Sequence, residues 1–363
     1  MKKFAIDVRW MVGRYRGMGK YATQLISSIE NKMIGFSPKN CEKSRLFDIK
    51  SGINFYPLWE QFTLPILAKK NNISFLICPY NTAPLIKPKN TKIILIIHDL
   101  IFMKTFAELP ISVSPYQTLG RLYRKFIVPR AIKNADYILT VSNFTKKQII
   151  NHFDYKLPLY VIPNAVSNDW MNLNVIPLEK RGNYFLTVTG EAPSKNLLRL
   201  LLSYIEYTKI IKSPTKLKIV GVKHSQKNKF LNKIASQPNI NNIEFLDFIS
   251  DEELKELYRN AKGFIFASLF EGFGIPLIEA MAVGTPIACS NTSSIPEVVG
   301  ECAYKFSPTC IDEIKNSFIY LDESFSSNII KNRVSNGLRR INLFSEENIS
   351  YQFKQFWKHI NEH

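Results

Sequence analysis

The stretch that decides the fold is SLFEGFGIPLIEAMAVGTPIACSNTSSIPEVVG, residues 268–300. It continues the apolar run GFIFAS, which is typical of a buried strand. A glycine-rich turn over 271–274 comes next, Pro276 suits the start of a helix, and LIEAMA continues that helix. Gly284 is placed to end the helix in a left-handed conformation, and PIACS then reads as the next strand. The stretch predicts a strand, a turn, a helix and a second strand in succession.

The turn in this stretch has the properties of an anion site. A glycine-rich turn at a helix N-terminus presents backbone N–H groups and the positive end of the helix dipole, which suits a diphosphate. Glu271 and Glu279 lie eight residues apart, and we expect Glu279 in the first helical turn. Because two carboxylates would repel a phosphate, they make sense as acceptors of hydrogen bonds from sugar hydroxyls. The alternative is that Glu279 only favours a helix start and that the glycines only form a turn.

Short apolar runs alternate with amphipathic stretches along the rest of the chain. The predicted strands are FAIDV (4–8), SFLIC (74–78), KIILII (92–97), YILTVS (137–142), YFLTVTG (184–190), KLKIVG (216–221), IEFLDF (243–248), GFIFAS (263–268) and PIACS (286–290), with helical stretches at 20–32 and 116–133. Such alternation predicts parallel strands with crossover helices, hence two doubly wound α/β domains. We place the domains at 1–165 and 166–345, with the turn-rich segment 159–170 leading into the linker. Residues 346–363 are expected to form a helix that packs back toward the first domain.

Composition excludes several classes of protein. The chain has 363 residues, of which 45% are hydrophobic and 21% charged, as in globular proteins. Its five cysteines form no CxxC pair, which argues against a disulfide framework or a zinc site. Asp7 and Arg9 interrupt any signal-peptide core, and the longest purely apolar run, 93–97, is far too short to cross a bilayer. We expect a cytoplasmic protein, soluble or peripheral to a membrane.

The positive charge is concentrated in the first half of the chain. Residues 1–165 contain 25 Lys and Arg against 9 Asp and Glu, so they carry +16 of the net charge of +18. A basic half joined to a nearly neutral half indicates an anionic partner, such as a bilayer with acidic lipids, a lipid-linked diphosphate or nucleic acid. The alternative cause is an AT-rich genome that over-uses Lys and Asn.

The stretch at 268–300 resembles the E-x7-E signature of the family 4 retaining glycosyltransferases, with Glu271 and Glu279 as its two acids. The similarity extends upstream from residue 248 and downstream to residue 300, roughly fifty contiguous residues, which is far more specific than a lone motif. Further similar segments are 5–26, 93–102, 135–149, 161–166 and 184–201. The resemblance implies the GT-B fold, in which two Rossmann-like doubly wound parallel-sheet domains face a central cleft. The N-terminal domain would bind the acceptor, and the C-terminal domain would bind the nucleotide-sugar donor.

The resemblance also implies roles for individual side chains. Glu279 would bind the ribose of the nucleotide, and Glu271 would hold a hydroxyl of the donor sugar. Lys195 would neutralise the leaving diphosphate, and His98 would reach the donor sugar. From position alone, Lys195 reads as a solvated lysine at a helix start, and His98 as a satisfied core histidine. Asp99 reads as an acid that caps its loop.

The donor-binding set also includes backbone groups and glycines. The resemblance assigns backbone N–H groups to Phe273, Gly274 and Ile275, and adds Gly272 and Gly190 in the donor domain. Gly17 and Gly19 would lie in a loop of the N-terminal domain that approaches the phosphates.

The chain departs from the family at one charged position. The family usually places an Arg close to Lys195, whereas Glu191 and Ser194 occupy that stretch here. A second cation would then come from Arg14, Arg16 or Lys20. No Asp-x-Asp pair occurs, so no divalent metal or other cofactor is expected.

The predicted function is sugar transfer with retention at the anomeric carbon. The resemblance favours GDP-mannose or dTDP-rhamnose as the donor, with UDP-sugars also possible, and a glycan or polyprenyl-diphosphate-linked oligosaccharide as the acceptor. This places the reaction in O-antigen or capsule synthesis at the inner face of the cytoplasmic membrane. The rivals are a non-catalytic GT-B scaffold, a GT-B sugar-nucleotide epimerase and a nucleic-acid-binding protein. Because only the pI of about 9.5 supports the last of these, no nucleic acid is expected as a partner.

Overall fold

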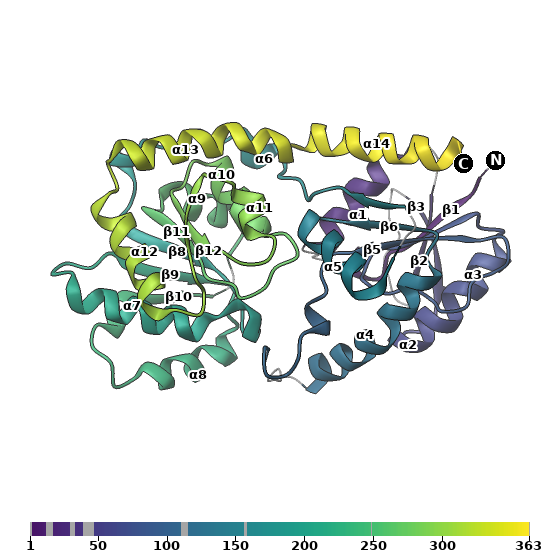
Figure 1. Ribbon diagram of the computed structural model, residues 1–363, viewed down its shortest axis with the longest axis horizontal. Coiled ribbons are helices and arrows are strands. Elements are labelled where there is room, and N and C mark those ends of the chain that lie inside the picture. Colours follow the sequence, from purple (N-terminus) through teal and green to yellow (C-terminus); the bar gives the residue numbers. More distant parts are fainter. Residues whose placement is uncertain are drawn as a thin grey trace. The chain divides into compact units, whose positions relative to one another are not determined.

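The computed structural model describes residues 2–11, 17–29, 33–38, 47–109, 115–155, 158–247 and 249–362. The chain divides into two compact units (Figure 1). Unit 1 comprises Met1–Lys104, Ser114–Ala165 and Glu346–His363, and unit 2 comprises Thr105–Val113 and Val166–Ser345. Each unit is built on a sheet in which every pairing of strands is parallel, so the predicted class of two doubly wound α/β domains is confirmed.

Unit 1 has a seven-stranded sheet in the order β3-β2-β1-β4-β5-β6-β7. Its strands are β1 (Phe4–Asp7), β2 (Met33–Pro38), β3 (Phe47–Gly52), β4 (Phe75–Cys78), β5 (Lys92–Ile97), β6 (Tyr137–Thr140) and β7 (Leu159–Val161). The four strands predicted from apolar runs are confirmed, whereas β2 and β3 were not predicted. The assignment of 159–170 to the linker is wrong at its start, because β7 pairs with β6.

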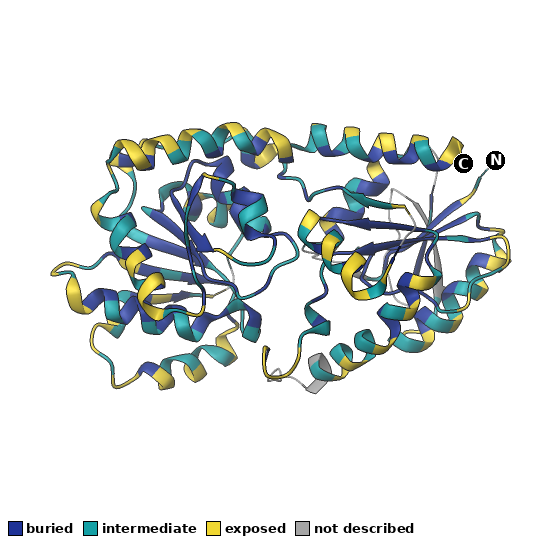
Figure 2. Ribbon diagram, viewed as in Figure 1, coloured by how far each residue is buried: buried dark blue, intermediate teal, exposed yellow. Residues whose placement is uncertain are grey.

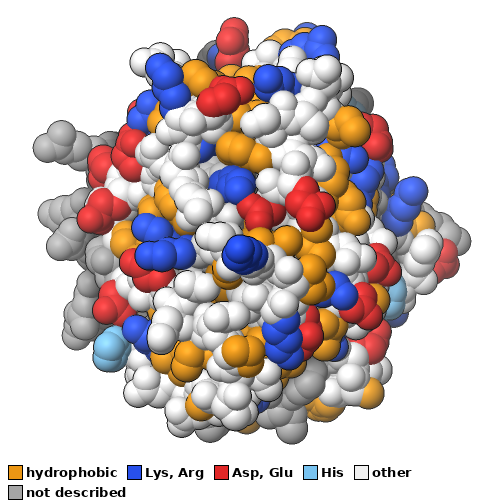
Figure 3. All heavy atoms as spheres, turned by 90° about the vertical axis from the view of Figure 1, so that its left-hand side faces the viewer, with side chains coloured by type: hydrophobic (Ala, Val, Ile, Leu, Met, Phe, Trp, Pro, Cys, Tyr) orange, Lys and Arg blue, Asp and Glu red, His pale blue; other side chains and the backbone are white. Residues whose placement is uncertain are grey.

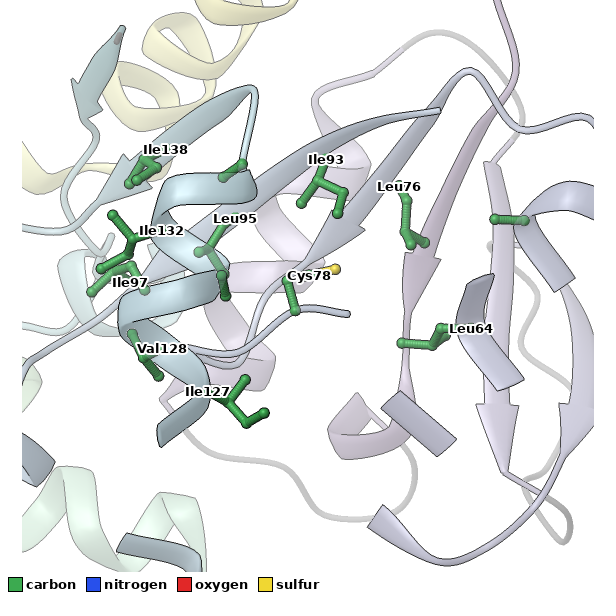
Figure 4. Packing of buried hydrophobic residues seen from close by; sticks show 14 of the residues in the cluster. Leu64, Leu76, Cys78, Ile93, Leu95, Ile97, Ile127, Val128, Ile132 and Ile138 are labelled. Carbon is green, nitrogen blue, oxygen red and sulfur yellow. The ribbon is translucent and has the colours of Figure 1, made fainter. Parts of the chain in front are cut away.

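Helices cover both faces of this sheet. They are α1 (Met18–Ser27), α2 (Tyr56–Leu58), α3 (Leu64–Lys70), α4 (Pro115–Asn134), α5 (Asn143–Phe153) and α14 (Glu346–Glu362), and a π-helical turn (Trp59–Thr63) joins α2 to α3. Alternate strand residues point to opposite faces of a sheet. Leu76 of β4 and Ile138 of β6 therefore share one face, where they pack with Leu64 of α3 and Val128 of α4 (Figure 4).

The C-terminal helix α14 belongs to the opposite face of unit 1 and lies beside α1. Trp357 packs edge-on against Phe4 of β1 with ring centroids 5.6 Å apart, and its indole N–H donates to Ser28 Oγ at 3.0 Å. Phe353 and Phe356 are buried on the same helix. The chain therefore returns to unit 1 after it has completed unit 2.

Unit 2 has a six-stranded sheet in the order β10-β9-β8-β11-β12-β13. Its strands are β8 (Tyr184–Val188), β9 (Lys216–Val220), β10 (Ile243–Leu246), β11 (Gly263–Phe266), β12 (Ile287–Ser290) and β13 (Ala303–Phe306). Its helices are α6 (Asn168–Met171), α7 (Leu197–Ile210), α8 (His224–Ile234), α9 (Asp251–Asn260), α10 (Ile275–Ala282), α11 (Ile295–Val299), α12 (Ile311–Glu323) and α13 (Asn328–Arg340). All five strands predicted for this half are confirmed, and only β13 was not predicted.

We predict that Trp357→Ala lowers the free energy of unfolding by about 3–5 kcal/mol, because it leaves a cavity in a close-packed layer and removes the indole N–H that donates to Ser28 Oγ. Chemical denaturation measures the loss. Tyr351→Ala on the same helix is the control, since Tyr351 is 61% exposed. Equal stabilities of the two variants would contradict the packing described for α14.

Candidate functional site

The candidate site in unit 2 is built from two loops at the carboxyl ends of neighbouring strands. β8 and β11 are paired in the sheet, so the loops that follow them emerge side by side. The backbone N–H of Leu269, in the loop after β11, donates to the carbonyl of Ser194, in the loop after β8, at 2.7 Å. The buried amide of Asn196 adds a second link, because Nδ2 donates to the carbonyl of Ala267 at 3.0 Å. These bonds fix Lys195 and Glu271 relative to each other.

Asn196 is a structural residue that the sequence analysis missed. It adopts a left-handed backbone conformation with φ 59° at the junction of the loop with α7. Its Nδ2 also donates to the carbonyl of Pro308 at 2.7 Å, and its Oδ1 accepts from Arg199 Nη1 at 2.6 Å. The sequence signal was weak, because an asparagine beside a lysine usually reads as solvated loop.

Lys195 and Glu271 form an ion pair in this structure. The distance from Lys195 Nζ to Glu271 Oε1 is 2.6 Å, and the side chains are 32% and 14% exposed. No other described residue pairs with the second carboxylate oxygen of Glu271. A pair this accessible contributes at most about 1 kcal/mol to the free energy of unfolding, so a ligand can rearrange it at small cost. Both residues were predicted for the site, but their pairing was not.

Two serines hold the turn that begins at Glu271. The backbone N–H of Glu271 donates to Ser293 Oγ at 3.0 Å, and Ser294 Oγ lies 3.0 Å from the carbonyl oxygens of both Glu271 and Phe273. Ser293 adopts a left-handed φ of 56°, which brings the two hydroxyls to the same turn. No role was predicted for these serines, because serines before Ile-Pro are typical of the cap of the next helix. Ser294 makes no such cap bond to α11.

Backbone N–H groups at the start of α10 remain open to a ligand. Gly274 precedes the helix with φ 113°, and within the described part of the chain the N–H groups of Phe273, Gly274 and Ile275 donate to no protein acceptor. The Phe273 side chain is buried against Phe344, with ring centroids 5.5 Å apart, so this contact anchors the turn in the core of unit 2. Such a helix start attracts anions through its N–H groups and the helix dipole.

Helix α10 ends as the sequence predicts, but Glu279 lies elsewhere than expected. Gly284 has φ 67°, and the N–H groups of Gly284 and Thr285 donate to the carbonyls of Met281 and Ala280, which completes a Schellman cap. Because α10 begins at Ile275, Glu279 is its fifth residue, and the prediction that it lies in the first turn is wrong.

Glu279 faces a buried tyrosine. Burial raises the pKa of the Tyr258 hydroxyl well above its usual value, and the Glu279 carboxylate raises it further. The Glu279 side chain is half-buried, so part of it remains accessible. Its predicted role toward the ribose stays a prediction.

Gly190 follows β8 at the same end of the sheet. A Cβ atom added to Gly190 would meet no protein atom within 4 Å, and its backbone φ lies outside the left-handed region. The packing of the protein therefore does not require glycine at this position. Space over the backbone is what a closely approaching ligand needs.

His98 follows β5 in unit 1 and is buried with one fixed ring nitrogen. Its backbone N–H donates to Asn81 Oδ1 at 2.6 Å, and Nε2 donates to the carbonyl of Pro79 at 2.9 Å. Tyr21 packs edge-on against the ring, with centroids 5.2 Å apart. No described residue pairs with Nδ1, which is therefore left as an acceptor. Burial lowers the pKa of His98 to about 4, so the imidazole is neutral at pH 7.

The remaining predicted residues of unit 1 are placed as follows. Gly17 precedes α1 with φ 37°, but the prediction that Gly19 lies in the loop is wrong, because α1 begins at Met18 and Gly19 is buried in its first turn. Lys20 is exposed on α1. Asp99 Oδ1 accepts the N–H of Ile101 at 3.0 Å, so its predicted role as a loop cap is confirmed. Arg14 and Arg16 lie outside the described residues.

Unit 1 also contains a buried carboxylate that the sequence analysis missed. Glu60 lies in the π-helical turn and accepts from the hydroxyls of Tyr56 at 2.9 Å and Tyr123 at 2.8 Å, from Gln61 Nε2 at 2.9 Å and from the Thr82 hydroxyl. Burial raises the pKa of Glu60, although the hydrogen bonds from the Thr82, Tyr123 and Tyr56 hydroxyls oppose the shift. The network joins α2 and the π-helical turn to α4.

Two further properties concern the part of the chain that the structure describes. It contains no group of three or more His, Cys, Asp or Glu side chains arranged to hold a metal ion. None of its helices combines the length and the apolar character needed to span a membrane.

Two family models match the chain. The model described as Glycosyltransferase Family 4 matches residues 39–170, and the model described as Glycosyl transferases group 1 matches residues 170–332. O-antigen chain mannosyltransferase B of Escherichia coli is 29% identical over 259 residues, which cover 68% of each chain. O-antigen chain mannosyltransferase RfbU of Salmonella typhimurium is 27% identical over 254 residues, which cover 70% of this chain and 65% of that protein. The matches thus span about two thirds of these relatives.

Solved structures share the fold over the full chain. Sucrose-phosphate synthase from Thermosynechococcus elongatus superposes with a TM-score of 0.74 at 15% identity, and a glycosyltransferase from Rickettsia africae with a TM-score of 0.71 at 16% identity. Both alignments cover 100% of each chain. These superpositions confirm the predicted GT-B fold. Because the two family models together span residues 39–332, the chain belongs to the family 4 glycosyltransferases. With the mannosyltransferases among its relatives, this makes it a hexosyltransferase of that family.

The burial of His98 predicts a pH-dependent stability. Its pKa is about 4 in the folded protein and 6.5 in the unfolded chain, so between these values only the unfolded state binds the proton. The free energy of unfolding should therefore fall by up to about 3 kcal/mol as the pH drops from 6.5 to 4.

Urea denaturation at several pH values measures this slope. His98→Gln should reduce it, whereas His152→Gln should not, because His152 is exposed on α5. An unchanged slope in His98→Gln would show that His98 titrates normally in the folded protein.

Proposed function

We propose that the protein transfers a hexose from a nucleotide sugar to a glycan or polyprenyl-diphosphate-linked acceptor with retention at the anomeric carbon. GDP-mannose or dTDP-rhamnose is the favoured donor, and a UDP-sugar is the alternative. The two relatives named as O-antigen mannosyltransferases support mannose and a role in surface polysaccharide synthesis, at the cytoplasmic face of the membrane. The observation that carries the proposal is the Lys195–Glu271 ion pair beside open N–H groups at the start of α10.

The leaving group in this reaction is a nucleoside diphosphate. When the bond from the anomeric carbon to the phosphate oxygen breaks, negative charge develops on that oxygen. Fixed N–H donors and a lysine cation in a partly buried site stabilise such charge without reorganisation. We assign this task to the N–H groups of Gly274 and Ile275 and to Lys195. No metal ion or other cofactor enters the proposal.

The acids of the site act on hydroxyl groups. A carboxylate can only accept hydrogen bonds, and a sugar offers several hydroxyl donors. Donor binding would release Lys195 from Glu271, so that the lysine meets the diphosphate and the carboxylate meets a hydroxyl of the sugar. Glu279, one turn into α10, would accept from the ribose.

The acceptor supplies the new bond to the anomeric carbon. Its hydroxyl attacks on the face that the diphosphate leaves, and the leaving phosphate oxygen takes the hydroxyl proton, so the configuration is retained and charge balances. Unit 1 would bind this acceptor, and His98, as a neutral imidazole, would accept from or orient a hydroxyl of the donor sugar.

We predict that Lys195→Ala and Glu271→Ala each lower the turnover number on the order of a hundredfold or more while the protein remains folded. Transfer of radiolabelled sugar measures turnover, and circular dichroism measures folding. The matched controls are Lys209→Ala and Glu206→Ala, which break an exposed ion pair of 2.7 Å on α7. Full turnover of either site variant would remove that residue from the mechanism.

A substitution at Gly190 tests where the donor binds. A change in folding stability would not explain the expected result, because the melting temperature should stay the same. Because the protein leaves space over Gly190, Gly190→Val should keep its melting temperature but bind the donor at least about tenfold more weakly, as a side chain there would meet the ligand. Thermal-shift titration with a panel of GDP-, dTDP- and UDP-sugars measures both quantities.

Gly120→Val on α4 is the control, since a Cβ at Gly120 also meets nothing closer than 3.7 Å. Equal donor affinity of Gly190→Val and the wild type would place the nucleotide sugar away from the loop after β8.

A further inference from the structure

Unit 1 carries two apolar stripes that no part of the described chain covers. On the helical segment from α2 to α3, Phe55, Leu58, Phe62 and Ile66 recur at helical spacing and are 59%, 42%, 60% and 61% exposed. On α4, Leu119, Leu122 and Phe126 recur in the same way and are 66%, 48% and 56% exposed. Figure 2 shows that exposed positions recur along helices, whereas the central strands are buried. Single exposed apolar residues are normal on a protein surface, but rows of them on neighbouring helices mark an interaction site.

The two stripes face the same side of unit 1. Leu64 of α3, and Ile127 and Val128 of α4, pack on one face of the sheet (Figure 4). Because the inner sides of both helices meet the same face, their outer sides point away from it together. We call the seven exposed side chains of these two stripes the apolar face.

A buried polar network holds the two helices side by side. Tyr123 of α4 packs edge-on against Tyr56 of α2, with centroids 5.2 Å apart, and donates its hydroxyl to Glu60 at 2.8 Å. Gln61 Nε2 donates to the Tyr123 hydroxyl at 3.1 Å. The apolar face is therefore one preformed surface.

Each stripe runs into basic side chains at the C-terminal end of its helix. Lys69 and Lys70 follow Ile66 and are exposed, and Arg130 and Lys133 follow Phe126 and are exposed. Arg130 lies over the Phe126 ring at 3.7 Å, so the apolar and basic parts are in contact. An apolar stripe edged with Lys and Arg is the pattern of helices that lie in a membrane interface.

The charge of these helices favours an anionic partner. α4 contains five Lys and Arg and no Asp or Glu, and the segment 53–70 contains a single acid, the buried Glu60. On the face of unit 2 in Figure 3, by contrast, acidic and basic side chains are interspersed. A second copy of this chain would bring two basic faces together, and like charges disfavour that contact.

We propose that the apolar face and its basic edge dock unit 1 onto an anionic lipid bilayer. Phe62, Ile66, Leu119 and Phe126 would enter the headgroup boundary, while the lysines and Arg130 meet lipid phosphates. The inference rests on the proposed function for its purpose, since docking brings the enzyme to a lipid-linked acceptor. It can nevertheless be measured without any sugar transfer.

The test is flotation of the full chain with vesicles of phosphatidylcholine alone or mixed with phosphatidylglycerol. The wild type should float with the mixed vesicles at low salt, and less at high salt, because screening weakens the electrostatic part. Phe62→Ser combined with Phe126→Ser should weaken binding at least about tenfold, because two large apolar side chains leave the interface. Lys69→Gln combined with Lys133→Gln should weaken binding chiefly at low salt.

The controls remove matched residues from unit 2. Ile210→Ser combined with Ile329→Ser changes side chains that are 58% and 59% exposed, and Lys212→Gln changes an exposed lysine. Neither control should alter flotation.

Three results would overturn the inference. The apolar variant could bind vesicles as well as the wild type does, or the wild type could ignore anionic vesicles. A dimer in solution that Phe62→Ser with Phe126→Ser dissociates would instead assign the apolar face to self-association.

Thermal shifts with nucleotide sugars separate docking from the proposed function. The apolar variant should keep donor binding. Absent donor binding with intact flotation would refute the proposed function and leave docking in place.

Discussion

One backbone hydrogen bond, from the N–H of Leu269 to the carbonyl of Ser194 at 2.7 Å, joins the two loops on which the site depends. It is possible because β8 and β11 are adjacent and parallel, so their following loops leave the sheet at the same edge. Lys195 comes directly after Ser194, and Glu271 comes two residues after Leu269. A shift in the pairing of these strands would therefore separate the ammonium group from the carboxylate.

The polar groups around this bond divide into two kinds. Asn196 and Ser294 are buried, and their hydrogen bonds to loop carbonyls are satisfied within the protein. Leaving such groups unpaired costs about 1–3 kcal/mol each, so their pairing makes the loops rigid. The N–H groups of Phe273, Gly274 and Ile275, in contrast, have no acceptor among the described residues. A rigid frame with open donors at a helix start is preorganised for an anion, which is the property that transfer from a diphosphate requires.

Much of this architecture could be predicted from the sequence, and the strands and side-chain roles that could not be predicted have physical explanations. Central strands of parallel sheets are buried on both faces, so they read as apolar runs, and all nine predicted strands are present. Three of the four missed strands, β3, β7 and β13, lie at sheet edges, where the apolar signal is weak. The helix-ending role of Gly284 could be predicted, because it depends only on the local backbone conformation that glycine permits. Ser293, Ser294 and Asn196 act instead through tertiary hydrogen bonds, which the spacing of residues in the sequence does not encode. The role of Glu60 could not be predicted, because two of its four donors, Thr82 and Tyr123, come from other segments of the chain.

The most direct measurement is a crystal structure of the protein with a bound nucleoside diphosphate sugar. We expect phosphate oxygens within hydrogen-bonding distance of the N–H groups of Gly274 and Ile275, with Lys195 turned from Glu271 toward the diphosphate. A nucleotide sugar bound elsewhere, with the turn at Glu271 empty and the ion pair intact, would contradict it.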